Sequence, residues 1–592
     1  MYPMRYFSFH INDIFVFLFF AIVTFSIAPD AFLHPFDVVI GDSRSDIWDH
    51  LWGHYRTEHS LLTYGKFPFF EGNINYPFGG NLYHVDLLNS VLVLPFRSLL
   101  GGIFCLNALV FFHMMFSSVA MYVLCRLLSC RRIPATAAAL LYSFAPHMLV
   151  FTLASGVSNR LNLGWIPLFF ICYGLILSKG FRWKYFWGAG LSFFFAALGC
   201  WHYAFFIFLL TIPLSLYILI LRSWRESWSE IFVHWIGKKM IPLAILCAIG
   251  AIPLSQAASG SIAMDSGGVY QRDHDLVWDG VSYFGLINDF FIIDLFVPFR
   301  MGLLVSYNFD LLYETSYLGY ALMIFAICGL WSKHPIRWLL MILSIVFVVL
   351  SFGTSLQWSQ FSEGQPSLFF YFCARYIPFM TAQEVPWEYL IPATFCLSIL
   401  GALGVENILH HLSKRWKLLL GIEFLTIVLL ELFMIAPTIV PIPTTQVQIP
   451  EHYFTLAQEP DHLAVFDYPT RRPKTSMIPT EYFYYQSVHN KPIPYAIKDA
   501  WIDRKELWAH LTRNQQSGGR DILEQISRFS DTEIQKTFDD LRSKGFGFFI
   551  VHKNLLEKGT IREHKVFFTS ILGQPKYEDS EIIRYDLLVG SQ

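Results

Sequence analysis

Three aspartates stand close together directly after the first apolar segment, at Asp42, Asp46 and Asp49. If this stretch is helical, their spacing places all three on one face, which also carries Arg56. Clustered carboxylates raise one another's pKa, which suits base catalysis, and together they can hold a cation. The alternative is an ordinary solvated face, and this stretch by itself does not distinguish the two.

The opposite face of the same expected helix is apolar, with Trp48, Leu51, Trp52 and Tyr55. We therefore expect the helix to lie at a membrane surface with its apolar side toward the lipid and its acids facing a cavity.

The composition is that of a polytopic membrane protein. Of the 592 residues, 54% are hydrophobic and only 15% are charged, and the mean hydropathy is +0.43. The net charge of -2 gives no sign of a nucleic-acid partner, since a phosphate-binding face would need a basic excess, and none is expected. The nine cysteines form no CxxC pair and none lies after residue 396, so neither a disulfide framework nor a zinc site is predicted.

Apolar runs predict about eleven membrane-spanning helices, the first of them a retained span rather than a cleaved signal. The expected spans are 11–28, 104–127, 134–152, 164–178, 185–200, 201–221, 239–257, 316–331, 337–353, 388–405 and 417–436. The fold class is therefore a polytopic α-helical membrane protein, with residues 1–436 as the transmembrane domain and 29–103 as a large first external loop.

Basic residues cluster in the short loops on one side of this topology, for example Arg131 and Arg132, Lys179 and Lys184. Basic loops mark the cytoplasmic side, so the first loop and the C-terminal tail are expected outside a bacterial inner membrane. The tail, 437–592, alternates strand-like runs at 462–468, 545–552 and 582–589 with a helical stretch at about 519–544. It is predicted to be a small α/β domain, periplasmic or extracellular.

The first loop resembles the GT-C class of membrane glycosyltransferases, in particular the catalytic subunit of oligosaccharyltransferase. That family has an acid opening an Asp-Pro-Trp motif, then Tyr-Arg, a glycine and a Tyr-Pro-x-Gly turn. Here the corresponding residues, in the same order, are Asp46-Ile47-Trp48, Tyr55-Arg56, Gly65 and Tyr76-Pro77-Phe78-Gly79. The chain is also similar to bacterial GT-C-like membrane proteins through runs at 162–168, 314–319 and 484–492.

Two family features are missing. The second external loop, 158–162, contains no carboxylate, and the tail lacks a Trp-Trp-Asp-Tyr-Gly motif. The resemblance therefore implies transfer of a single sugar, to a lipid, a glycan or a protein, from a polyprenyl-phosphate-linked donor.

The resemblance assigns the base to Asp46, because the family's functional aspartate falls on it. Asp42 and Asp49 would tune Asp46 or share with it a divalent cation such as Mg²⁺ or Mn²⁺. An inverting transfer also needs cations for the departing phosphate. External arginines at the membrane surface are candidates for that task, and Glu314 is a candidate second acid or helix cap. The arginines are Arg160, Arg272, Arg300 and Arg375.

Arg56 either contacts substrate or forms a structural bridge to Asp49. Tyr76 is a candidate sugar contact whose alternative role is turn formation. Membrane lipids are further expected partners. Two other functions stay open: a transporter or flippase of lipid-linked glycans, and a non-catalytic assembly factor for cell-surface glycans. A transporter would place charges at the bilayer midplane, whereas here the acids gather outside the spans, which favours the enzyme.

Overall fold

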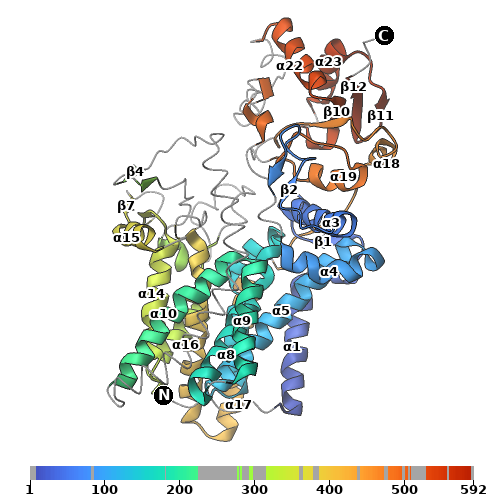
Figure 1. Ribbon diagram of the computed structural model, residues 1–592. Coiled ribbons are helices and arrows are strands. Elements are labelled where there is room, and N and C mark those ends of the chain that lie inside the picture. The colour runs from blue at the N-terminus through green and yellow to red at the C-terminus, as the bar shows by residue number, and fades with distance from the viewer. Residues whose placement is uncertain are drawn as a thin grey trace. The chain divides into compact units, whose positions relative to one another are not determined.

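In the computed structural model, residues 9–81, 86–180, 182–223, 277–278, 281–282, 292–297, 315–358, 364–377, 380, 386–436, 440–472, 478–496, 500–504, 507–508, 529–556 and 559–587 are described. They form two compact units (Figure 1). Unit 1 comprises Met1–Phe36, Asp86–Asn89 and Phe104–Thr444, and unit 2 comprises Asp37–Val85, Ser90–Ile103 and Thr445–Gln592. This division differs from the one expected from the sequence, because the first loop clusters with the tail rather than with the spans.

Unit 1 is helical. Within the described residues, five helical segments are long and apolar enough to cross a membrane by length and composition: Gly102–Leu127, Ser158–Lys179, Trp201–Leu221, Pro386–His410 and Lys414–Ile435. Shorter apolar helices include α1 (Ile11–Ile27), α9 (Trp183–Gly199), α13 (Tyr320–Gly329) and α14 (Arg337–Ser351). The chain is therefore a multi-pass membrane protein. The expected span 239–257 lies outside the described residues.

The centre of unit 1 is α16 (Leu390–His410), in which every residue from Leu390 to Val405 is buried. It packs against α6 (Arg132–Ser143), α13 and α14. Small residues permit this close packing: a Cβ on Gly404 would lie 2.3 Å from the carbonyl oxygen of Phe325, and one on Gly329 would lie 2.1 Å from that of Leu400. The α13–α16 contact thus depends on glycine, as is common between membrane helices.

The expected span 134–152 is not one continuous helix. Instead α6 ends at Ser143 and is followed by α7 (Pro146–Met148), a π-helical turn η1 (Leu149–Ala154) and a 3-10 segment η2 (Ser158–Gly164). The last of these runs into α8 (Trp165–Lys179). Pro146 cannot continue the α-helical hydrogen bonding, which accounts for the break.

The tail of unit 2 contains a four-stranded sheet in the order β11-β12-β10-β9 (Figure 1). The strands are β9 (Ala464–Tyr468), β10 (Phe546–His552), β11 (Tyr577–Glu578) and β12 (Ile582–Asp586). β9 and β10 are parallel, and β10–β12 and β12–β11 are antiparallel. β9 and β10 are buried along their full length, so this sheet forms the core of the unit.

Helices α19 (Glu481–His489), α22 (Asp531–Ser543) and α23 (Ile561–Leu572) belong to the same unit. Part of the helical stretch expected at 519–544 is α22, and the part before residue 529 lies outside the described residues. Ser530 caps α22 through a reciprocal capping box with Glu533.

The first loop contributes α3 (Ile47–Tyr64), the short hairpin β2 (Phe70–Glu71) with β3 (Gly80–Asn81), and most of α4 (Leu87–Leu100). α3 packs on α19, and Trp52 of α3 belongs to the same hydrophobic core as the sheet. Residues 434 positions apart in sequence are thereby joined, since Trp52 Nε1 donates to Gln486 Oε1 at 2.7 Å.

Candidate functional site

The acid loop, residues 41–46, precedes α3 rather than belonging to it. α3 begins at Ile47 with Asp46 as its N-cap residue, and the amide of Ser45 donates to the carbonyl of Asp42 at 3.0 Å in a turn. The expected helix through Asp42 is therefore wrong: a turn at Asp42–Ser45 takes Asp42 out of helical register with Asp46 and Asp49.

The three carboxylates consequently have three different environments. Asp42 is bound by Arg44, whose backbone N and Nε donate to Oδ1 at 2.9 and 3.1 Å and whose Nη2 donates to Oδ2 at 3.1 Å. Asp46 is exposed at the N-terminus of α3, where the helix dipole favours a negative charge. Asp49 is half-buried one turn further on.

Asp46 and Asp49 form an acid pair whose two carboxyls differ in burial. Burial of its carboxyl, and then the negative charge of Asp46, raise the pKa of Asp49 well above its usual range. Asp49 Oδ1 is buried and accepts no hydrogen bond. An exposed Asp46 beside an Asp49 whose pKa is raised is an arrangement that suits a base with a less acidic neighbour.

The acids do not fit a metal site as they stand. Among the described residues no group of three or more His, Cys, Asp or Glu side chains could hold a metal ion. Both oxygens of Asp42 are already engaged by Arg44. No catalytic step is therefore assigned to a cation shared by the three aspartates.

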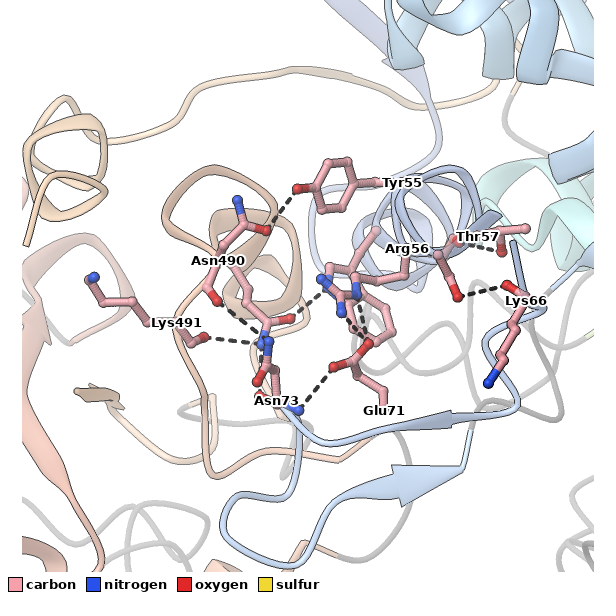
Figure 2. Close-up of polar contacts among 12 residues, drawn as sticks. Tyr55, Arg56, Thr57, Lys66, Glu71, Asn73, Asn490 and Lys491 are labelled. Carbon is pink, nitrogen blue, oxygen red and sulfur yellow. Dashed lines mark hydrogen bonds and ion pairs between the residues drawn. The ribbon is translucent and has the colours of Figure 1, made fainter. Parts of the chain in front are cut away.

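The apolar face of α3 packs on the tail and not on a lipid surface, contrary to expectation. The Trp48 ring lies 5.4 Å from that of Tyr484, and the Trp52 ring lies 5.3 Å from that of Phe483, both on α19. Tyr55 Oη donates to Asn490 Oδ1 at 2.7 Å (Figure 2). The sequence pattern identified a buried face correctly but not the partner that covers it.

Arg56 does not pair with Asp49. Its Nε donates to Glu71 Oε2 at 2.9 Å, and a second bond comes from Nη2, as Figure 2 shows. The Arg56 side chain is 7% exposed and that of Glu71 is 10% exposed. Glu71 also accepts from the amide of Asn73 at 3.0 Å. The bridge therefore ties α3 to the β2–β3 hairpin, which is a structural role.

Tyr76 likewise takes part in packing between the loop and the tail. Its carbonyl accepts from Trp501 Nε1 at 2.6 Å, its amide donates to the carbonyl of Ile493 at 3.0 Å, and its ring lies 5.8 Å from that of Phe546. These contacts agree with the turn-forming alternative.

In unit 1, Arg160 is part of an ion cluster whose centre the sequence analysis missed. Arg160 Nη2 lies 2.6 Å from Glu388 Oε1, and His202 Nδ1 pairs with the other oxygen, Glu388 Oε2. The Glu388 side chain is 1% exposed, and those of Arg160 and His202 are both 14% exposed. One carboxylate thus faces two cationic groups when His202 is protonated.

Three helix N-termini meet at this cluster. Arg160 lies in η2 ahead of α8, His202 is the second residue of α10 (Trp201–Ser223), and Glu388 lies in η7 (Pro386–Tyr389) ahead of α16. Tyr203 Oη donates to the carbonyl of Arg160 at 2.6 Å, which fixes the segment. Helix N-termini favour anions, so the cluster combines three partial positive ends with two basic side chains. The available sequence signal was the carboxylate that opens the apolar run at 388.

Asp86 is a second carboxylate that the sequence analysis missed. It is 2% exposed and accepts from Asn89 Nδ2 at 2.7 Å and from Ser158 Oγ at 3.0 Å. Burial raises the pKa of Asp86 to about 7, although these hydrogen bonds oppose the shift. Asn89 Oδ1 in turn pairs with His113 Nε2 at 2.7 Å. The segment 158–162 contains no carboxylate, but its Ser158 donates a hydrogen bond to Asp86.

The remaining candidates are not brought into this cluster in the part of the chain that is described. Arg375 lies exposed in the last turn of α15 (Leu368–Tyr376). Glu314, Arg272 and Arg300 lie outside the described residues. At the start of α13, the carboxylate of Glu431 accepts from the amides of Tyr320 and Ala321.

No protein-family model and no curated protein matches the sequence. Solved structures do match. The mycobacterial arabinofuranosyltransferase AftD aligns with a TM-score of 0.57 at 12% identity over 94% of this chain and 36% of AftD. The apo oligosaccharyltransferase of Archaeoglobus fulgidus aligns with a TM-score of 0.52 at 12% identity over 91% of this chain and 69% of that one. The chain thus spans 36% of the AftD chain it matches. Its fold is GT-C-like, which confirms the resemblance seen in the sequence.

Proposed function

We propose that this protein is a membrane glycosyltransferase that transfers a sugar from a polyprenyl-phosphate-linked donor to an acceptor outside the membrane. The single observation that carries the proposal is the exposed carboxylate of Asp46 at the N-terminus of α3, in a chain with a GT-C-like fold. The membrane is a bacterial inner membrane crossed about eleven times, with the acid loop and the tail on the external side. The acceptor is a hydroxyl group of a lipid, a glycan or a protein.

In the proposed reaction Asp46 takes the proton of the acceptor hydroxyl. The acceptor oxygen forms a bond to the anomeric carbon while the bond from that carbon to the phosphate oxygen breaks. The electron pair leaves with the polyprenyl phosphate, and the anomeric configuration inverts. The raised pKa of Asp49 disfavours a second negative charge beside the base.

The ion cluster of Arg160, His202 and Glu388 is the proposed binding site for the donor phosphate. Support comes from two basic side chains sharing one carboxylate and from the helix N-termini that meet there. Arg375 is a second phosphate candidate on the same unit.

The proposal is tested with the purified full-length protein in detergent or nanodiscs. Radiolabelled polyprenyl-phosphate sugars are supplied with membrane extracts as the source of acceptor, and labelled product is counted. Wild-type protein should transfer label, and Asp46→Asn should not. Asp461→Asn is the control, because the Asp461 side chain is 94% exposed and lies away from the acid loop in sequence. Equal transfer by wild type and Asp46→Asn would contradict the proposal.

A further inference from the structure

The backbone of the acid loop is held by side chains from the tail. Thr480 Oγ1 donates to the carbonyl of Ser45 at 2.8 Å, and Arg472 Nη2 donates to the carbonyl of Ser43 at 3.2 Å. Thr445 Oγ1 donates to the carbonyl of Gly41 at 2.7 Å. The carbonyls of Gly41, Ser43 and Ser45, which flank Asp42 and precede Asp46, thus accept from residues more than 400 positions later in the chain. All of these residues belong to unit 2.

The hydroxyl of Thr480 binds the acid loop and not its own helix. It is the N-cap residue of α19, where a threonine side chain ordinarily accepts from an amide in the first turn of its own helix. Here it makes no such cap and instead reaches the acid loop. Thr480 has helical dihedrals, φ -66° and ψ -16°, and its hydroxyl is directed to the carbonyl of Ser45.

Arg472 joins the loop to α19 through one nitrogen. Nη2 pairs with Glu481 Oε1 and also donates to Ser43, and both side chains are buried. Ser43 additionally accepts from Trp48 Nε1 at 2.7 Å, so one carbonyl receives a donor from the tail and a donor from α3. Ser45 lies directly before Asp46, so movement of its carbonyl would also turn the Asp46 side chain.

We propose that Thr480 and Arg472 are positioning residues for Asp46, which makes the tail an integral part of the catalytic unit. This inference rests on the function proposed above. A general base must lie within hydrogen-bonding reach of its proton, and misplacement by about 1 Å can cost about 100-fold in rate. Since the loop's own side chains leave the carbonyls of Gly41 and Ser45 without a bond, the tail supplies the bonds that hold it.

Two conservative variants test the proposal in the full-length protein. Thr480→Val keeps the shape but removes the hydroxyl, and Arg472→Lys keeps a charge for Glu481 but shortens the side chain that reaches the carbonyl of Ser43. We expect kcat to fall by about 10- to 100-fold with the KM for donor within about threefold of wild type. Thr480→Ser should restore kcat. Thr537→Val is the matched control, because Thr537 donates to the carbonyl of Glu533 in an exposed turn of α22.

Hydrogen exchange of the amides of residues 43–48 gives a readout independent of activity. The exchange rate should rise in Thr480→Val and Arg472→Lys and stay unchanged in Thr537→Val. Wild-type kcat or wild-type exchange in both variants would overturn the inference, as would losses no greater than those of Thr537→Val. If wild type transfers no sugar, the proposed function fails, while faster exchange would still show that the tail orders the loop.

Discussion

Arg56 Nε and Glu71 Oε2 lie 2.9 Å apart in a bridge whose two side chains are about nine-tenths buried. Removing one partner of a buried pair leaves an unpaired charge, so Arg56→Ala should destabilise the protein by about 3 to 5 kcal/mol. The melting temperature of the solubilised protein measures this loss. Arg56→Met combined with Glu71→Met should recover much of it. A substrate-binding Arg56 would instead leave the melting temperature unchanged and raise KM.

Asp46→Asn tests the catalytic base. The change keeps size and hydrogen bonding but removes the charge, so turnover should fall by about 10² to 10⁴-fold while folding is unaffected. Asp42→Asn and Asp49→Asn should be milder, because Asp42 is engaged by Arg44 and the raised pKa of Asp49 makes its carboxyl a poorer source of negative charge. Complementation of a deletion strain at equal membrane abundance compares the three. Equally severe losses in all three would favour a shared cation over a single base.

Asp49 should make stability fall as the pH rises. Its raised pKa means that the folded protein keeps a proton that the unfolded chain releases near pH 4. Stability is therefore lost from about pH 4 up to the raised pKa of Asp49. Asp49→Asn removes this dependence. The melting temperature of the variant should therefore rise relative to that of wild type as the pH is raised from 4 to 8. If the difference in melting temperature stays constant across that range, or if Asp461→Asn shows the same rise, the raised pKa of Asp49 is contradicted.

Substitutions at Arg160 and at Glu388 in the ion cluster should affect the KM for the donor differently. Arg160→Gln removes a cation and should raise the KM for the donor by about 10-fold or more, a loss of roughly 1.4 kcal/mol or more for a charge-assisted bond. Glu388→Gln neutralises the competing carboxylate and should leave that KM unchanged or lower it. Initial rates against donor concentration provide both values. An equal rise in KM for both variants would indicate that the cluster is only structural.

The topology is tested by cysteine labelling in intact spheroplasts. A cysteine introduced at Gln535, exposed on α22, should react with a membrane-impermeant maleimide, since no native cysteine lies in the tail. A cysteine at Lys184, exposed in the first turn of α9 and expected on the cytoplasmic side, should react only after lysis. The reversed pattern would place the acid loop's partner domain inside the cell.

Much of the architecture follows from local sequence. Long apolar runs predicted helices such as α5 (Gly102–Leu127), α8 and α10 to within a few residues in most cases, because a helix that spans lipid must satisfy its own backbone and cover itself with apolar side chains. Alternating and β-branched runs likewise anticipated β9, β10 and β12. The assignment of Asp46 as the base came from the family resemblance of its motif, and it stays a prediction.

The pairing of side chains was decided only by tertiary structure. The sequence placed Asp42 on a helix and Arg56 beside Asp49, because helical spacing was the only geometry available to it. In the fold, Ser43 and Ser45 bond to Arg472 and Thr480, and Arg56 bonds to Glu71. No local pattern around Glu388 indicated that Arg160 and His202 form ion pairs with it. Hydrophobic periodicity is a local property that one helix imposes on its own sequence, whereas a charge takes its partner from whichever distant segment the packed core brings near.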